Sequence, residues 1–192
     1  QIIGFVLTLF FPLKNDKIVI CNYYGKGYGD NAKYIVEEII KQNLNYDIVW
    51  MLKGDLIRKS NFPNRIRVVK YGSFKALFEM ATAKIWIDNC RKSFYPPKRK
   101  NQFYIQTWHG GIALKKVEKD VEDKLAKNYI KYAKKDSKMA DLFLSNSKFC
   151  SDMYRRAFWY RGDILECGSP RVDILFSGDY SIASRVKEYF GL

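Results

Sequence analysis

The single histidine of this 192-residue chain lies where an apolar segment gives way to glycine and lysine. His109 follows residues 103–107, a run typical of a strand, and is followed by Gly110 and Gly111. Histidine is the side chain whose ordinary pKa lets it accept or donate a proton near neutral pH. An α/β sheet presents its chemistry where strands end, and glycine permits positive φ and close approach of a ligand. His109 is therefore the first candidate for proton transfer.

The neighbours of His109 add charge and an aromatic ring. Lys115 and Lys116 lie within one or two helical turns of it and are placed to screen phosphate charge. Because side chains alternate along a strand, Trp108 is predicted to fix the imidazole by packing on the opposite side of the strand. The alternative is a hydrogen-bonded structural histidine, and histidine alone specifies no reaction.

A glycine-rich loop, residues 22–30, separates the first predicted strand from a helix. It lacks the G-x-G-x-x-G spacing of a dinucleotide site and has no phosphate-loop lysine followed by Ser or Thr. We therefore favour a turn that ends at Asp30 and Asn31, either of which can cap the helix. The alternative is a loop that contacts the acceptor of a transfer reaction through these two residues.

Residues 168–173, with the sequence GSPRVD, follow the last predicted strand. They are typical of a turn in which Pro170 opens a helix and Arg171 pairs with Asp173. The alternative places Arg171 on an anionic group, because its planar guanidinium suits phosphate. On the residues alone we favour the turn.

The four cysteines, Cys21, Cys90, Cys150 and Cys167, lie far apart and include no C-x-x-C pair. With one histidine they form no cluster of zinc-ligand spacing, so no metal site is expected. Each lies at or near the end of an apolar run, where a reduced cysteine behaves as a small hydrophobic residue. This pattern favours a reducing, cytosolic compartment.

The pattern of apolar residues predicts alternating strands and helices. Strands are expected at 17–21, 46–52, 66–69, 84–88, 103–107, 142–144 and 164–167. Helices are expected at 31–42, 73–82, 121–138, 148–158 and 181–190, with Ser73 capping the second and Asn146 or Ser147 opening the fourth. Strands joined by such helices form parallel β-α-β units with right-handed crossovers. The predicted fold class is α/β, a Rossmann-like three-layer domain with a mostly parallel sheet.

Charge and the first apolar segment bear on the partners of the chain. Lysine and arginine number 34 against 20 acidic residues, and this net charge of +14 attracts polyanions. Residues 1–13 are almost wholly apolar but too short to span a membrane, so a packed or membrane-surface helix is expected. The lysine-rich run 115–138 is typical of a solvated helix face, with binding to an anionic membrane surface as the alternative.

Four stretches together resemble the CDP-glycerol glycerophosphotransferase family, the teichoic-acid primases and polymerases of Gram-positive bacteria. They are FPLKNDKIVI, YGDNAKYIVEEI, QTWHGGIALKK and DLFLSNSKF, the last running on to GSPRVDILF. Their order and spacing agree with the family along nearly the whole chain. One block departs from it: His-Gly-Gly-Ile-Ala-Leu-Lys stands where the family commonly has His-Gly-Thr-Pro-Leu-Lys, which bears on the acceptor more than on the reaction class.

The resemblance implies the N-terminal, acceptor-side half of a GT-B fold, in which two Rossmann-like domains face each other across a cleft. We accordingly expect an apolar helix tail at 1–15, the acceptor-side domain at 16–178 and the start of an interdomain linker or helix at 179–192. In the family the histidine of the W-H-G motif is the proposed general base, a role that falls on His109. The family's donor-site histidine and CDP-binding residues belong to a C-terminal domain outside this chain.

We therefore expect an acceptor hydroxyl, deprotonated by His109, to attack CDP-glycerol and expel CMP at the cytoplasmic face of the membrane, without a cofactor. The candidate substrate-binding residues are Gly110, Gly111, Lys115, Lys116, Arg171, Asp173, Asp30 and Asn31. The acceptor is a polyol phosphate or a surface glycan, and the chain alone is expected to be inactive. The alternatives are a non-catalytic membrane or acceptor-binding module and a basic nucleic-acid-binding domain, for which no recognised motif is present.

Overall fold

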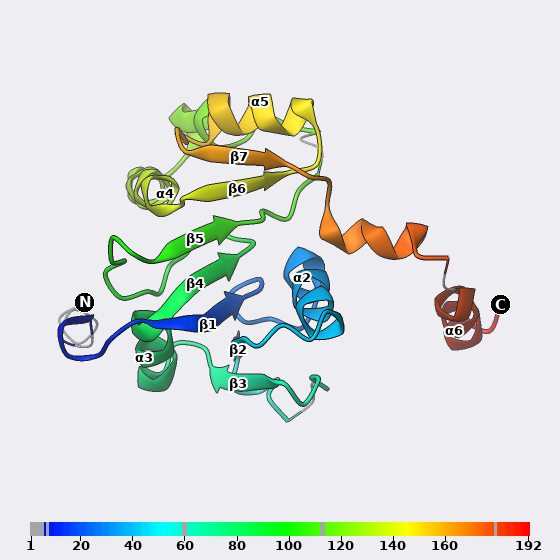
Figure 1. Ribbon diagram of the computed structural model, residues 1–192. Helices are drawn as coiled ribbons and strands as arrows, with labels where there is room; N and C mark the ends of the chain where they lie inside the picture. The colour runs from blue at the N-terminus through cyan, green and yellow to red at the C-terminus, as the bar shows by residue number, and fades with distance from the viewer. Residues whose placement is uncertain (1–5, 7, 59–60, 112–113, 179) are drawn as a thin grey trace.

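A seven-stranded parallel sheet forms the centre of the computed structural model, which describes residues 6, 8–58, 61–111, 114–178 and 180–192 (Figure 1). The strands are β1 (Lys14–Cys21), β2 (Asp47–Leu52), β3 (Ile66–Lys70), β4 (Ala83–Asp88), β5 (Phe103–Gln106), β6 (Leu142–Ser145) and β7 (Asp163–Glu166). Their order is β3-β2-β1-β4-β5-β6-β7, and each neighbouring pair is parallel. The order reverses between β1 and β4, and open α/β sheets bind ligands at such a point.

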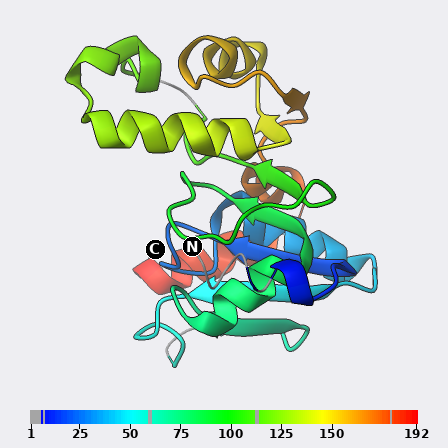
Figure 2. The ribbon, with the colours of Figure 1, turned by 90° about the vertical axis from the view of Figure 1, so that its left-hand side faces the viewer.

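Helices cover both faces of the sheet. They are α2 (Asp30–Lys41), α3 (Phe74–Thr82), η1 (Glu118–Lys124), α4 (Lys127–Met139), α5 (Lys148–Ala157), η2 (Pro170–Phe176) and α6 (Tyr180–Phe190). Because strand side chains alternate, Val19 and Cys21 share one core cluster with residues of α3 and α5, whereas Ile18 and Ile20 share the other with α2. Figure 2 shows α4 and α5 together at the end of the sheet that β6 and β7 form.

The predicted fold class and all seven predicted strands are confirmed. Two predicted caps are also present: Ser73 Oγ accepts from the backbone N–H of Ala76 at 3.1 Å, and Ser147 Oγ accepts from that of Cys150 at 3.3 Å. These caps satisfy backbone donors that a helix start leaves without partners. Helix α6 covers the whole of the predicted final helix at 181–190, and its role as the start of a linker stays a prediction.

The sheet starts two residues before the predicted domain start at residue 16, and the division into domains stays a prediction. Strand β1 begins at Lys14, which pairs with Ala83 of β4, so residues 14 and 15 belong to the sheet and not to the apolar tail. Within that tail, Val6 and residues 8–10 are helical, while residues 1–5 and 7 lie outside the described residues.

The predicted long helix at 121–138 is also wrong, because two helices replace it. The backbone is extended at Leu125 and Ala126, between η1 and α4. Glu118 at the start of η1 is buried and binds Tyr129 of α4 and Arg91 from another loop. These contacts fix the start of η1 against α4 and against the loop that carries Arg91.

The predicted capping of α2 by Asp30 or Asn31 is wrong as well. Gly29 occupies the cap position, and no side chain caps this helix. Within the helix Asp30 Oδ1 accepts only from the backbone N–H of the next residue, Asn31, at 2.7 Å. The side chains of both residues also bond to groups from distant loops. Within the described part of the chain, no helix combines the length and the apolar character needed to cross a membrane.

Candidate functional site

The loops that follow β1, β4 and β7 converge on His109, which itself follows β5. The ring centroid of Tyr23, after β1, is 5.5 Å from that of the imidazole. Asn89, after β4, and Arg171, after β7, both hydrogen-bond to His109. Because parallel strands present their carboxyl ends at one edge, His109 lies close to the point where the strand order reverses.

One ring nitrogen of His109 is held by a backbone carbonyl. Its Nδ1 lies 2.6 Å from the carbonyl oxygen of Asn89. Because a carbonyl oxygen only accepts, Nδ1 carries the hydrogen, and in the neutral ring Nε2 is the proton acceptor. The residue is partly exposed. His109 therefore has a defined tautomer and a basic nitrogen that is not used by this contact.

The side chain of Asn89 is held from two sides. Its Oδ1 accepts from the backbone N–H of Tyr23 at 2.8 Å, and its Nδ2 donates to Asp30 Oδ2 at 2.9 Å. Asn89 is fully buried, so losing either partner would leave a polar group without compensation for its lost hydration. These bonds hold in place the carbonyl that orients His109.

Arg171 joins the start of η2 to the same group. Its Nη1 donates to Asp30 Oδ1 at 3.0 Å and to the carbonyl oxygen of His109 at 2.9 Å. Its backbone N–H donates to Asn31 Oδ1 at 3.2 Å. The predicted pairing with Asp173 is wrong because the Asp30 carboxylate is 3% exposed and needs a cation, whereas Asp173 is hydrated at the surface.

Four non-glycine residues around His109 adopt left-handed backbone conformations. The φ angles are 44° at Tyr23, 57° at Tyr24, 56° at Asp30 and 49° at Trp108. For side chains of these types such a conformation costs about 1–3 kcal/mol each, and it persists only where surrounding contacts enforce it. Strain of this kind concentrates at functional sites.

The two glycines after His109 do not use the positive φ that glycine permits. Neither Gly110 nor Gly111 has a positive φ. Gly111 leaves little space for a side chain, because a Cβ added there would lie 2.7 Å from Asn146 Nδ2 and the Asn146 side chain would have to move. Its carbonyl oxygen accepts from that Nδ2 at 3.1 Å, which joins the loop after β5 to the loop after β6.

Trp108 stacks directly on His109. The ring centroids are 4.4 Å apart and the planes differ by 28°. The prediction that Trp108 packs on the opposite side of the strand is wrong, because β5 ends at Gln106 and the left-handed backbone at Trp108 breaks the alternation. The edge of the indole also meets Phe158, whose centroid lies 4.7 Å away. The stack restrains the plane of the imidazole.

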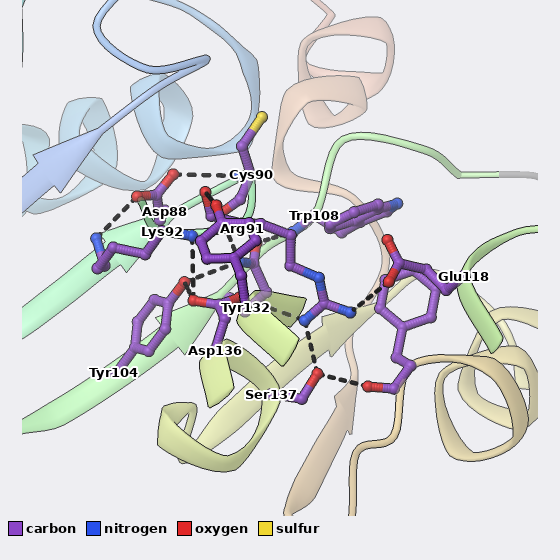
Figure 3. A network of polar contacts seen from close by, with 12 residues as sticks. Asp88, Cys90, Arg91, Lys92, Tyr104, Trp108, Glu118, Tyr132, Asp136 and Ser137 are labelled. Carbon is purple, nitrogen blue, oxygen red and sulfur yellow. Dashed lines mark hydrogen bonds and ion pairs between the residues drawn. The ribbon is translucent and has the colours of Figure 1, made fainter. Parts of the chain in front are cut away.

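A buried arginine connects Trp108 to the helices behind the site (Figure 3). The guanidinium carbon of Arg91 lies 5.5 Å from the Trp108 ring centroid, and its side chain is 1% exposed. Its Nη2 donates to Glu118 Oε2 at 3.2 Å, and its Nη1 donates to Asp136 Oδ2 at 3.3 Å and Ser137 Oγ at 2.6 Å. Although burial acts to lower it, the Glu118 and Asp136 carboxylates raise the pKa of Arg91, which stays charged.

A pocket of about 550 Å³ opens beside His109. Its walls are mainly apolar and include Val117 and Leu125, while Lys115 and Lys116 line it with exposed side chains. The two lysines predicted to bind substrate therefore share a pocket with the histidine. Apolar walls with a few convergent polar groups are typical of small-molecule sites.

Cys90 lies beside His109 but is not arranged as a nucleophile. Its Sγ is 3.7 Å from Nδ1, the nitrogen that already bonds to the Asn89 carbonyl. Burial, followed by the negative charge of Asp88, raises the pKa of the Cys90 thiol to about 12. A thiolate is the reactive form, so this protonated thiol disfavours covalent catalysis through cysteine.

Most of the residues predicted from the sequence come together in space. Those that line one small hollow are Asn31, His109, Gly110, Gly111 and Arg171. Asp173 lies apart, beside Tyr34 and Lys41 of α2. All four cysteines are free, and the described residues contain no group of three or more His, Cys, Asp or Glu side chains placed to hold a metal ion.

The prediction from sequence missed Asn89, Arg91 and Tyr23. The signal for the first two is the polar run 88–92, DNCRK, which directly follows the apolar residues of β4. Polar residues after a buried strand lie at the edge of the sheet where sites form. No comparable signal marks Tyr23, which contributes a backbone N–H and a ring within a glycine-rich loop.

Comparison with known proteins gives relatives along nearly the whole chain. The teichoic acid poly(glycerol phosphate) polymerase of Bacillus spizizenii is 31% identical over 193 residues, which cover 93% of this chain and 47% of the relative. The teichoic acid glycerol-phosphate transferase of Staphylococcus aureus is 32% identical over 180 residues, which cover 89% of this chain and 44% of the relative. The chain thus spans under half the length of these curated relatives.

Solved structures agree with the sequence relatives. A variant of the wall teichoic acid polymerase TagF matches with a TM-score of 0.85 and 29% identity, covering 94% of this chain and 45% of that one. A TagF variant soaked with CDPG matches with a TM-score of 0.84 and the same coverage. Residues 3–192 match the family model described as CDP-Glycerol:Poly(glycerophosphate) glycerophosphotransferase. This chain therefore belongs to the CDP-glycerol:poly(glycerophosphate) glycerophosphotransferase family.

Proposed function

We propose that His109 is the general base of a glycerophosphotransferase and that this chain forms the acceptor side of its cleft. The observation that carries the proposal is the bond from Nδ1 to the Asn89 carbonyl, which leaves Nε2 as the proton acceptor. Lys115 and Lys116 in the same pocket offer positive charge for phosphate. Membership of the family supports CDP-glycerol as the donor.

The proposed step is a displacement at phosphorus. The acceptor hydroxyl gives its proton to Nε2 of His109 while its oxygen forms a bond to the β-phosphorus of CDP-glycerol. The bond between that phosphorus and the bridging oxygen of CMP breaks, and CMP leaves with the electron pair. General-base assistance of this kind is worth about 10²–10⁴ in rate. The chain's lysines offset the charge on the phosphoryl group, and no cofactor is expected.

In this proposal Asp30, Asn31 and Arg171 act mainly by holding the His109 loop, since their polar atoms bond to that loop and to each other. The side chain of Arg171 is 31% exposed, which supports a further contact with an anionic group of a substrate. Gly110 and Gly111 bring the backbone close to the same hollow. The position of Asp173 beside α2 gives a substrate contact no support.

The rest of the cleft and the membrane are the proposed partners of this chain. The curated relatives are about twice as long or longer, which supports a second domain that supplies the CDP-binding residues and completes the GT-B fold. Exposed Leu9 and Phe10, together with the net charge of +14, support peripheral contact with anionic lipid at the cytoplasmic face. The acceptor is a teichoic-acid-like polyol phosphate or a surface glycan.

The test replaces His109 in the full-length protein. We expect His109→Ala to lower CMP release from CDP-glycerol by about 10²–10⁴-fold, while calorimetry gives the same affinity for CDP-glycerol. Imidazole added to the buffer should restore part of the lost rate, because a small base can occupy the space that the ring leaves. Unchanged turnover would show that His109 is not the base, and CMP release by the 192-residue chain alone would contradict the shared cleft.

A further inference from the structure

Helix α4 carries a row of lysines on a single face. Lys127, Lys131, Lys134, Lys135 and Lys138 are all exposed and, at 100° per residue, fall on one side of the helix. Within the described part of the chain only Lys134 has a carboxylate partner, Glu122 at 2.7 Å. The other four have no carboxylate partner there and form a positive strip, in which Lys135 lies over the Tyr95 ring at 5.3 Å.

The strip is unfavourable for the helix itself. Like charges spaced four residues apart repel each other, and Lys127 at the first position repels the positive end of the helix dipole. The first turn of α4 has no acidic residue and no side-chain cap. Helix α2 shows the ordinary arrangement: Asp30 in its first turn and the pairs Lys33–Glu37 and Lys41–Glu38. The charges of α4 therefore do not serve the stability of their own helix.

A groove runs along this lysine strip. Two adjoining hollows, of about 420 and 310 Å³, share Tyr95 and Lys135. Lys131 lines the first hollow and Lys138 lines the second, where Lys98 is also present but is paired with Asp141 at 2.8 Å. No acidic residue is among the described residues that line either one. The lysine ammonium group is a compact charge suited to phosphate, so the groove fits a polyanion.

The wall opposite α4 leads back to the histidine. It is the segment 93–98, which continues the loop whose Asn89 carbonyl accepts from His109. Where the two walls approach each other, the Tyr132 hydroxyl of α4 donates to the carbonyl of Arg91. Residues 89–92 of this loop are buried, so the loop connects the groove wall to His109 beneath the surface. Helix α4 lines both places, with Asn128 at the groove and Tyr129 at the pocket beside His109.

We propose that the groove between α4 and residues 93–98 binds the phosphodiester chain of a polyanionic acceptor, several units behind the hydroxyl that reacts. Lysines four residues apart on a helix are separated by about 6 Å along its axis. Phosphates joined through a three-carbon polyol recur at a similar interval, so successive charges can meet successive lysines. The proposal rests on the proposed function, because it names the chemistry of the acceptor used by that site.

The test reverses three charges in the full-length protein, with Lys131→Glu, Lys135→Glu and Lys138→Glu combined. For an acceptor that carries a polyol-phosphate oligomer we expect KM to rise about tenfold, since several exposed charge contacts are lost together. For an acceptor with a single phosphate the change should be much smaller. A matched control combines Lys41→Glu, Lys75→Glu and Lys187→Glu, which alters net charge equally but away from the groove.

Two outcomes would overturn the proposal that the groove binds the phosphodiester chain. One is an equal rise in KM for both acceptors with the groove variant, and the other is the same rise in KM with the control variant. Direct titration of the wild-type and variant chains with the oligomer separates this proposal from the proposed function. Oligomer affinity that falls with the groove variant supports the groove even if no transfer is detected. Co-sedimentation with phosphatidylglycerol vesicles is the third arm. A groove variant that loses vesicle binding but keeps oligomer affinity would identify a membrane contact instead.

Discussion

Two ionic clusters around buried carboxylates differ in how many cations bind one carboxylate. At the sheet edge near the start of β3, Glu79 accepts hydrogen bonds from Lys17 and from the 44% exposed Arg67, which also binds Asp47. Behind the candidate site, Arg91 alone serves two carboxylates, one of which is Asp136. Glu79 therefore keeps one bound cation if the other is removed, whereas Glu118 and Asp136 share the single cation of Arg91.

The carboxyl groups respond to this difference. Although burial acts to raise it, hydrogen bonds from Arg67 and Lys17 keep the pKa of Glu79 below its ordinary value. Burial raises the pKa of Asp136, and attraction to Arg91 offsets only part of that effect. A buried carboxylate is therefore well compensated at the amino edge of the sheet and less well compensated beside the site.

The clusters also differ in what they hold. Lys17, Glu79 and Arg67 lie in regular strands and a helix, which they tie together. Arg91 lies in a loop, contacts Trp108 and draws the buried Glu118 of η1 toward the site. Ion pairs between basic and acidic side chains thus join regular elements of the sheet in one region, and in the other they hold loops around a histidine.

The largest expected effect tests the shared cation. Arg91→Met leaves Glu118 and Asp136 buried without their guanidinium, so we expect the free energy of unfolding to fall by about 3–5 kcal/mol. Lys17→Met leaves Arg67 on Glu79 and should cost less, about 1–3 kcal/mol. Urea denaturation of both variants measures the difference. Equal losses would show that the second cation at the amino edge has no compensating role.

The next effect separates position from stability. Trp108→Ala in the full-length protein removes the ring that stacks on His109, and a misplaced base should lower kcat by about tenfold to a hundredfold. Phe78, 5.6 Å from the Lys17 ammonium, is the matched aromatic residue of the other cluster. We expect Phe78→Ala to lower the melting temperature with little change in kcat. If both variants reduce kcat alike, Trp108 acts through stability alone.

The smallest effect is the dependence of stability on pH. Because the pKa of Glu79 is lower in the folded than in the unfolded chain, Glu79 adds to the free energy of unfolding above about pH 4.3. This contribution is lost as pH falls through the folded pKa. The pKa of Asp136 is raised in the folded chain, so pH has the opposite effect. The contribution of Asp136 to the free energy of unfolding falls as pH rises through the folded pKa. Urea denaturation between about pH 5 and pH 3 should show that Glu79→Gln loses less of its free energy of unfolding on acidification than the wild type does. For Asp136→Asn the loss should be as steep as in the wild type or steeper, and the reverse order would contradict the comparison.

The fold was predictable because its signals are local. Apolar runs such as those of β1 and β2, separated by helical spacing, predict parallel β-α-β units, and Ser73 and Ser147 mark helix starts by their own hydroxyl groups. The break between η1 and α4 at Leu125 was not predictable, because Glu118 of η1 binds Arg91, which is distant in sequence. Helix boundaries depend on such contacts as much as on propensity.

The class of fold, the family and the histidine at the end of a strand could be predicted from the chain alone, since these depend on residue type and order. The contact of His109 Nδ1 with the Asn89 carbonyl and the pairing of Arg171 with Asp30 rather than with Asp173 are visible only once the chain is folded. Those partners lie 20 to 141 residues apart in sequence. Their pairing follows from which strand ends meet at one sheet edge and from which buried charges need compensation there.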